Sequence, residues 1–339
     1  MDHINAKTKR PLFVLTVLVA LIMTVFFISL NSGVVQITPL DVLKTFAGLG
    51  TEKDQLVLFD FRLPRMIIAL LIGAGLAVSG AILQGVAQND LADPGILGIN
   101  AGAGFAVVLY IFFFQDSLTG LGTISIFIMP FFALLGAAVA AFLIYTIAWK
   151  SGITPVRLIL VGIGVNAGFA AALILFQLKM DPRDFMQATV WISGSISGSN
   201  WTFVLATLPW ILVFIPLAIY KARFLNILNL GDQLATGLGV HVEKERRIML
   251  IVAVALAGAC VSVGGGIAFL GLVAPHLARR IVGPKHQILI PTSALMGALL
   301  LLIADMISRT ILTPTELPVG LVVSALGAPY FIYLLMKTN

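Results

Sequence analysis

The sequence of 339 residues contains very little cysteine and very little charge. Its single cysteine, Cys260, lies in an apolar run and cannot form an internal disulfide, an iron–sulfur cluster or a zinc site. We interpret it as a small hydrophobic core residue. Only 11% of the residues are charged, 59% are hydrophobic and the mean hydropathy is +1.06, whereas soluble domains carry about 25% charged residues. These values exclude an ordinary soluble domain and indicate a membrane protein.

The sequence also lacks groups that would supply energy or catalysis. It has no G-x-x-x-x-G-K-[ST] phosphate-binding loop, and no Asp, Glu, His or Lys lies mid-span, where a proton or sodium relay is expected. The acid furthest inside a span is Asp305, which we interpret as the i,i+4 salt-bridge partner of Arg309. His276 has no second His or Cys at metal-ligand spacing. We therefore predict no catalytic residues, no metal site and no cofactor in this chain.

Hydrophobic runs predict an all-α, polytopic membrane protein with about ten transmembrane helices, because about 20 apolar residues in a helix cross a bilayer. The predicted spans cover residues 12–30, 66–86, 96–114, 123–149, 158–178, 201–220, 248–263, 267–281, 288–309 and 319–336. No convincing cleavage site follows the first run, so it is kept as a membrane helix. We expect one transmembrane domain over residues 1–339.

The basic residues set the predicted topology. An even number of spans places both termini on one side, and seven of the 21 basic residues then lie on the other side: Lys44, Lys53, Arg62, Arg65, Lys179, Arg183 and Arg309. The remaining fourteen lie on the side of the termini, which the positive-inside rule assigns to the cytoplasm. The tail at 1–11 and the polar connection at 221–247 are then cytoplasmic. Because the basic residues are dispersed between spans, we do not assign the net charge of +6 to nucleic-acid binding.

Two polar stretches predict short helices on the outer side. In Thr38-Pro39-Leu40-Asp41, a proline follows a capping threonine, which is typical of a helix start. Residues 179–200 are too polar and too short to cross the bilayer, and we expect an external segment with a short helix that dips partly into the bundle.

Three motifs stand out. Arg62-Leu63-Pro64-Arg65 precedes the second span, Asn89-Asp90-Leu91-Ala92-Asp93-Pro94-Gly95 precedes the third, and residues 264–280 read GGGIAFLGLVAPHLARR. Together these motifs resemble the permease family of the type II ABC importers, which take up ferric siderophores, haem and cobalamin. The resemblance covers about residues 12–336 and implies that family's membrane fold.

The resemblance implies a role and a set of partners. The chain would be a permease subunit in the bacterial plasma membrane, paired with a second, identical or paralogous permease. It would bind two ATPase subunits, which hold ATP and magnesium, and receive cargo from an extracytoplasmic substrate-binding protein. Ferric siderophore is the expected cargo, and haem and cobalamin remain alternatives. A stand-alone secondary transporter is the other alternative; it would require an intramembrane acid or an inverted repeat with broken helices, neither of which is clear.

Three arginines on the outer side depart from the positive-inside rule: Arg62, Arg65 and Arg309. From the residues alone, they could extend along the lipid to the headgroups or pair with carboxylates on another protein. The resemblance favours the second interpretation, in which they receive acidic residues from the two lobes of the binding protein.

The connection at residues 228–240 has helix-forming residues interrupted by glycines. From its spacing it could be an ordinary solvated loop, or a compact knob of two short helices. In the resembling family this region couples to the ATPase subunits. The residues that we assign to coupling are Gly231, Asp232, Ala235, Gly237 and Gly239.

Two polar turns with a proline nearby match the cytoplasmic gate of the family. The gate residues implied by the resemblance are Asn89, Asp90, Leu91, Thr154 and Pro155. This chain has Asp90 where the family often has proline, and Pro155 where a small hydroxyl residue is common, so the gate is expected to differ in shape. Residues 316–320 and 326–329 also match the family and are interpreted as structural, capping and packing the last span.

Overall fold

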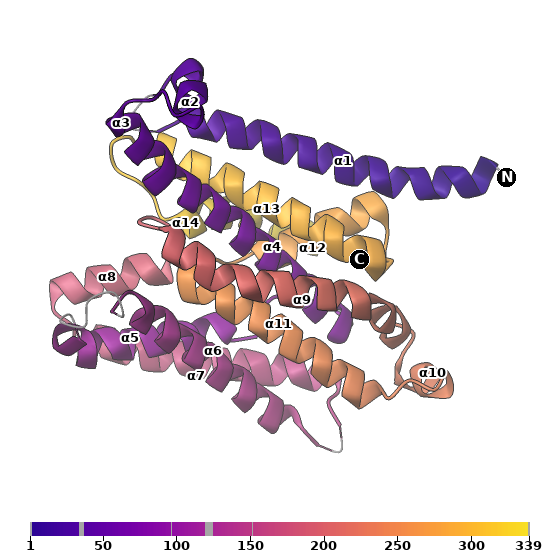
Figure 1. The fold of residues 1–339 in the computed structure, drawn as a ribbon. Helices are drawn as coiled ribbons and strands as arrows, with labels where there is room; N and C mark the ends of the chain where they lie inside the picture. Colours follow the sequence, from indigo (N-terminus) through magenta and orange to yellow (C-terminus); the bar gives the residue numbers. More distant parts are fainter. Residues whose placement is uncertain (1, 34–36, 96, 119–124, 151, 338–339) are drawn as a thin grey trace.

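The computed structural model describes residues 2–33, 37–95, 97–118, 125–150 and 152–337, and within these ranges every regular element is helical. The helices in chain order are α1 (Asp2–Asn31), α2 (Pro39–Phe46), α3 (Glu52–Gln55), η1 (Leu56–Arg62), α4 (Leu63–Val86), α5 (Ile99–Leu118), α6 (Ser125–Ala148), α7 (Pro155–Gln177), α8 (Pro182–Ile192), α9 (Trp201–Leu228), α10 (Asp232–Gly237), α11 (Val242–Gly264), α12 (Leu270–Val282), α13 (His286–Thr310) and α14 (Val319–Lys337). Figure 1 shows their arrangement as one bundle.

The predicted membrane architecture is confirmed. Eight helical stretches of the described residues are long and apolar enough to cross a membrane. The shorter α5 and α12 complete a set of about ten. The seventh and eighth predicted spans form the separate helices α11 and α12, because Gly265 (φ 69°) and Phe269 (φ 63°) turn the backbone between them. Positive φ is strained for phenylalanine, and it stops the two helices from merging.

Some boundaries differ from the prediction. Helix α1 begins at Asp2, so the described part of the predicted N-terminal tail is helical. Helix α9 continues past the predicted end at Tyr220 to Leu228. Lys221 does not end it because its Nζ lies 2.9 Å from a carboxylate oxygen of Glu245 on α11, and the residues that follow turn an apolar face to the bundle. The connection predicted at 221–247 is therefore shorter.

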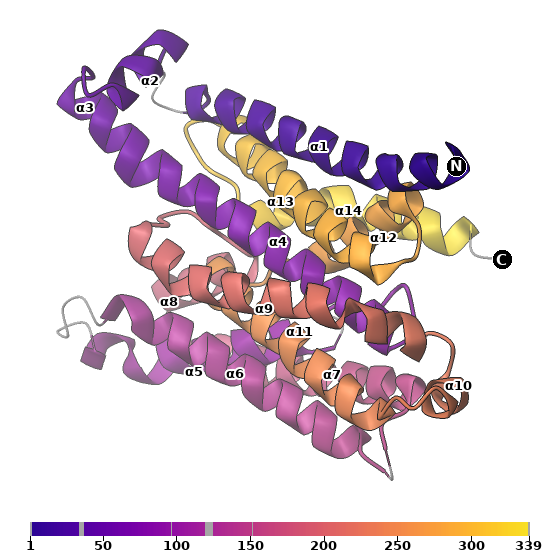
Figure 2. The same cartoon turned by 45° about the vertical axis from the view of Figure 1, so that its right-hand side comes forward.

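Helix α4 lies in the middle of the bundle, between the α13 side and the α9–α11 side (Figures 1 and 2). In lipid the hydrophobic effect does not draw helices together, so small residues that permit close backbone approach drive packing. Gly73 of α4 meets Gly297 of α13, and Gly80 meets Gly271 of α12. These contacts bury α4 on several sides and fix the position of the arginines at its outer end.

Replacing Gly80 with alanine should separate α4 from α12. The added Cβ would lie 2.7 Å from the Cα of Gly271, and backbone atoms cannot move aside as a flexible side chain can. We expect a loss of about 1–3 kcal/mol of stability, measured as a lower thermal unfolding temperature of the purified protein. Gly168→Ala on α7 is the matched control, since a Cβ there meets no atom within 4 Å. Equal unfolding temperatures for the two variants would contradict this packing role.

The two ends of the bundle differ. Helices α2, α3 and α8 lie at one end, whereas α10, the start of α1 and the end of α14 lie at the other (Figures 1 and 2). Both predicted short helices are present: Thr38 caps α2 by accepting a hydrogen bond from the backbone N–H of Asp41, and α8 lies within the predicted external segment. We refer to these as the α8 end and the α10 end.

Candidate functional site

The three predicted docking arginines lie together at the α8 end of the bundle. Arg62 is the last residue of η1, Arg65 lies in the first turn of α4, and Arg309 lies in the last turn of α13. Their exposed fractions are 5%, 9% and 5%. All three side chains therefore turn into the protein rather than extending along lipid.

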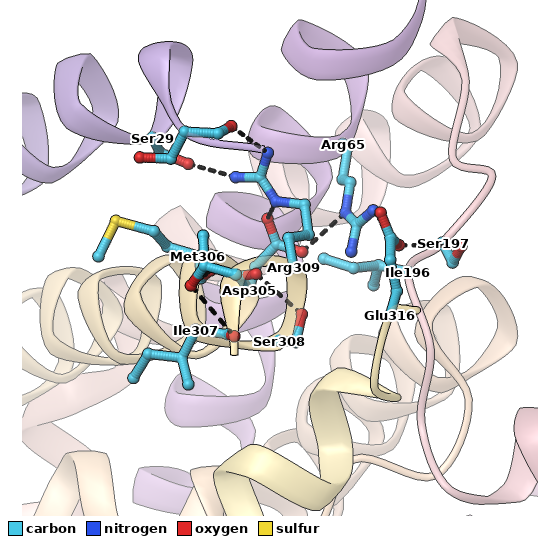
Figure 3. Close-up of polar contacts among 12 residues, drawn as sticks. Ser29, Arg65, Ile196, Ser197, Asp305, Met306, Ile307, Ser308, Arg309 and Glu316 are labelled. Atoms are coloured by element: carbon cyan, nitrogen blue, oxygen red, sulfur yellow. Dashed lines mark hydrogen bonds and ion pairs between the residues drawn. The ribbon is translucent and has the colours of Figure 1, made fainter. Parts of the chain in front are cut away.

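Arg65 joins two carboxylates from different parts of the chain (Figure 3). Its Nε lies 2.7 Å from Oδ1 of Asp305 on α13, and its Nη1 lies 2.7 Å from Oε2 of Glu316, which follows α13. Glu316 also accepts a hydrogen bond of 3.4 Å from the hydroxyl of Ser197, after α8. Arg65 thus links three segments at this end.

Arg62 and Arg309 reach the end of α1. Arg62 donates to the carbonyl of Leu30, and Arg309 donates to the hydroxyl of Ser29. Guanidinium groups are favourable at this position because the C-terminus of a helix carries partial negative charge. Arg309 Nε also lies 3.1 Å from Oδ2 of Asp305, which confirms the predicted i,i+4 salt bridge. We call Arg62, Arg65, Arg309, Asp305 and Glu316 the arginine cluster.

Sequence reasoning identified the three arginines but missed how the two acids join them. It identified Asp305 only as the neighbour of Arg309, and Glu316 only as part of a structural cap. Arg65 and Asp305 are 240 residues apart in sequence, so no spacing rule pairs them. The sequence does contain one signal for this contact: Asp305 lies near the outer end of a span that also contains Arg309, which departs from the positive-inside rule.

The predicted coupling residues lie at the α10 end. Asp232 begins α10 and pairs with Arg246 of α11 at 2.7 Å, as expected for an acid in a first turn. Ala235 is buried, and Gly231 (φ 95°) and Gly239 (φ 79°) make the turns on either side of the helix. Gly237 is its last residue.

The predicted pair of short helices at this end is wrong, because α10 is the one short helix between Gly231 and the start of α11. A turn through Gly239 leads directly into α11. Arg246 holds the arrangement together: it is 1% exposed, and it also donates to Glu243 at 3.0 Å and to the carbonyl of Ile153 at 2.6 Å.

Three leucines at intervals of four residues form an exposed apolar stripe on this knob. Leu230, Leu234 and Leu238 are 56%, 62% and 63% exposed. Leu234 and Leu238 lie one helical turn apart, since the N–H of Leu238 bonds the carbonyl of Leu234 at 3.0 Å, whereas Leu230 precedes the turn at Gly231. Exposed apolar side chains gathered in this way are typical of a protein contact. We call these three residues the leucine stripe.

The predicted gate residues form two separately anchored turns. Asn89 accepts a hydrogen bond from the backbone N–H of Leu91 at 2.9 Å, and Asp90 forms an ion pair with Arg279 of α12. Thr154 and Pro155 start α7, next to the Ile153 carbonyl that Arg246 of α11 binds. One turn is thus fixed to α12 and the other to α11.

A cavity of about 570 Å³ lies between the loop at 93–95 and helices α5, α7, α8, α12 and α14. Its lining is mostly apolar, including Trp191, Phe269 and Phe331, with the carboxamides of Asn100 and Asn166. The one charged lining residue is Asp93, whose carboxylate accepts a hydrogen bond from the N–H of Gly95 at 2.7 Å. Such a cavity suits a bulky ligand with little net charge.

Comparisons with known proteins identify the family. Residues 21–337 match the FecCD transport family. The chain is 64% identical over 335 residues to the iron(3+)-hydroxamate import system permease protein FhuG of Bacillus subtilis (strain 168), covering 99% of this chain and 100% of the relative. It is 44% identical to the iron-uptake system permease protein FeuC of the same organism, covering 94% and 96%.

A solved structure agrees. An inward-facing conformation of a metal-chelate type ABC transporter superposes with a TM-score of 0.82 at 29% identity, covering 96% of this chain and 99% of that chain. Matches over nearly the whole length in both sequence and fold leave no large segment unexplained. The chain therefore belongs to the FecCD transport family, the family of type II ABC importer permeases that its motifs resemble.

Proposed function

We propose that this permease carries ferric siderophores of the hydroxamate class across the bacterial plasma membrane. The observation that carries the proposal is the 64% identity, over the full length, to a relative named as an iron(3+)-hydroxamate import permease. Other relatives are named for iron uptake and Fe(3+)-citrate import, so iron-chelate cargo is common to the group and the chelate varies.

The mostly apolar cavity supports a cargo without net charge. A ferric ion bound by three singly charged hydroxamates is neutral, whereas the complex with three doubly charged catecholates is strongly anionic. A buried anion requires compensating cations, and the residues that line the cavity include no Lys or Arg. The cavity therefore favours the hydroxamate complex, with affinity residing mainly in the binding protein.

Uptake of radioactive iron by cells that depend on this permease tests the cargo. The cells also need its ATPase and binding-protein partners, and they receive iron as hydroxamate, catecholate or citrate chelate, with haem and cobalamin supplied separately. We expect accumulation from the hydroxamate chelate alone. Accumulation of haem or cobalamin, or of iron from the catecholate or citrate chelate, with none from the hydroxamate, would overturn the assignment.

The arginine cluster is the proposed docking site for the binding protein. Arg62, Arg65 and Arg309 gather positive charge at the α8 end, and arginine binds carboxylates through two parallel hydrogen bonds. Acidic residues on the two lobes of the binding protein would complement this surface. Electrostatic complementarity of this kind increases both association rate and specificity.

The α10 end is the proposed cytoplasmic contact with the ATPase subunits. The leucine stripe would enter an apolar cleft of the ATPase, while Gly231, Gly237 and Gly239 shape the knob and Asp232 and Ala235 hold α10 against the bundle. ATP and magnesium would bind the ATPase. The start of α1 and the end of α14 also lie at this end, which the charge-based topology would place in the cytoplasm. A second permease, identical or paralogous, would complete the pathway.

The Asp90–Arg279 ion pair is proposed to hold the gate closed by tying the turn after α4 to α12. Asp90→Asn should weaken this link and raise passive leakage of iron chelate from loaded proteoliposomes by about two- to fivefold, as expected for a partly exposed pair. Asp54→Asn at the opposite end is a control that also removes one acid. Leakage equal to that of the unmodified protein would contradict the gating role.

A further inference from the structure

Arg65 has two acidic partners that lie at different depths. The side chain of Asp305 is 0% exposed, while that of Glu316 is 33% exposed. Both lie 2.7 Å from the guanidinium, Asp305 at Nε and Glu316 at Nη1 (Figure 3). One carboxylate is thus sealed inside the protein, and the other forms the outer surface of the cluster.

Asp305 touches two of the proposed docking arginines at once. Its Oδ1 faces Arg65 of α4 and its Oδ2 faces Arg309 of α13 at 3.1 Å. Because Asp305 is fully buried, it cannot contact another protein. Its bonds instead fix the distance and orientation between the two guanidinium groups before any partner arrives, and such preorganisation lowers the entropic cost of binding.

Glu316 occupies the edge of Arg65 that a carboxylate from outside would use. The Nε side is filled by Asp305, so a bidentate pair with an incoming carboxylate must form at the terminal nitrogens, where Glu316 now binds at Nη1. An approaching acidic residue therefore meets a like charge on the same nitrogen. A bidentate pair between the partner's carboxylate and both terminal nitrogens therefore requires Glu316 to leave Nη1.

We infer that the two acids act in opposite directions on docking: Asp305 positions Arg65 and Arg309 for the binding protein, and Glu316 is an internal ligand of Arg65 that the binding protein's carboxylate displaces. This inference rests on the docking role proposed above.

The displacement would reach the cavity. Glu316 lies shortly before the start of α14 in sequence. Its hydrogen bond to Ser197 joins it to the segment that follows α8. Helix α14 supplies Phe331 to the cavity lining, and α8 supplies Trp191 and Ile192. Release of Glu316 from Arg65 removes this tie between α4 and both segments at the moment of docking.

The test measures the dissociation constant between the binding protein, loaded with ferric hydroxamate, and the complete importer in lipid nanodiscs. Glu316→Gln should tighten binding by about two- to fivefold, since a partly exposed ion pair no longer has to be broken. Asp305→Asn should weaken it by about tenfold or more, although it too removes a negative charge. Glu52→Gln on α3, an exposed acid outside the cluster, is the control and should change nothing.

Loss of a buried partner can also impair folding, so a second variant tests positioning. Ser29→Ala removes the hydroxyl that Arg309 binds, with little change in volume, and should weaken docking in the same direction as Asp305→Asn. The dissociation constants are compared only among variants whose thermal unfolding temperature and ATPase content match those of the unmodified importer.

The outcomes distinguish the docking role of Arg65 from the displacement of Glu316. If Arg65→Gln leaves the dissociation constant unchanged, the docking role itself fails. If Arg65→Gln weakens binding but Glu316→Gln also weakens it, Glu316 is a structural tie and the displacement is wrong. If Asp305→Asn and Ser29→Ala both tighten binding, the positioning role is wrong and bulk charge alone governs docking.

Discussion

Replacing Arg62 and Arg309 together by glutamine should reduce iron-chelate uptake about 100-fold or more while the permease remains in the membrane. Each arginine would lose a charge-assisted bond to the binding protein, and truncating one side of such a buried pair costs about 2–5 kcal/mol. Two losses of about 2 kcal/mol each already reduce binding by more than 100-fold, because the two factors multiply. The measurement is initial uptake of radioactive iron, normalised to permease abundance.

Glutamine is the informative substitution because of what surrounds these residues. A glutamate at position 309 would face the buried carboxylate of Asp305, and the repulsion between two buried like charges would destabilise the fold itself. Glutamine is neutral and adds no carboxylate, although it is too short to reach Ser29 and the Leu30 carbonyl, which the terminal guanidinium nitrogens bind. The control is the double variant Lys44→Gln with Lys53→Gln, which removes the same amount of positive charge from α2 and α3 and should leave uptake near normal. Equal losses of uptake in both double variants would indicate a general charge effect and contradict specific docking.

The second large effect is expected at the leucine stripe. Changing Leu234 and Leu238 to aspartate should separate the permease from its ATPase and reduce transport about 100-fold, because burying one leucine at an interface contributes about 1.5–3 kcal/mol and a buried unpaired carboxylate adds a further cost. The measurements are ATPase recovered with the tagged permease and ATP turnover stimulated by loaded binding protein.

The opposite end of the molecule offers a matched control for this pair. Leu40 of α2 and Leu49, which follows α2, are 61% and 77% exposed, so changing both to aspartate makes the same chemical change on a surface that should not meet the ATPase. We expect normal recovery and normal stimulation. If the leucine-stripe variant retained stoichiometric, stimulated ATPase, α10 would not be the coupling contact.

Local patterns in the sequence were sufficient for the helices but not for the contacts between them. Long apolar runs determine membrane helices because the bilayer requires them, and Thr38 before Pro39 determines the start of α2. The end of α9 was misplaced because the charge of Lys221 is neutralised by Glu245 on another helix, which no local pattern contains. The same limit hid the bond between Arg65 and Asp305.

For the candidate sites too, the sequence predicts which residues stand out but not how they contact one another. An arginine that departs from the positive-inside rule is visible in sequence, and so is an interrupted polar connection. Whether Arg62 turns outward or inward depends on the end of α1 that receives it. The single helix of α10 depends on Arg246, which ties it to α11 and to Ile153. The charge pattern, the polar connection and the family resemblance identified the positions, and tertiary packing determined their geometry.

We propose that this permease has no energy source of its own and transports only when a separate ATPase drives it. Reconstitution in sealed liposomes tests this most directly, comparing the chain alone with the chain plus ATPase and loaded binding protein. We predict that ferric hydroxamate accumulates only with all three components and ATP, whatever the ion gradient. Accumulation by the chain alone, driven by a proton or sodium gradient, would contradict the claim.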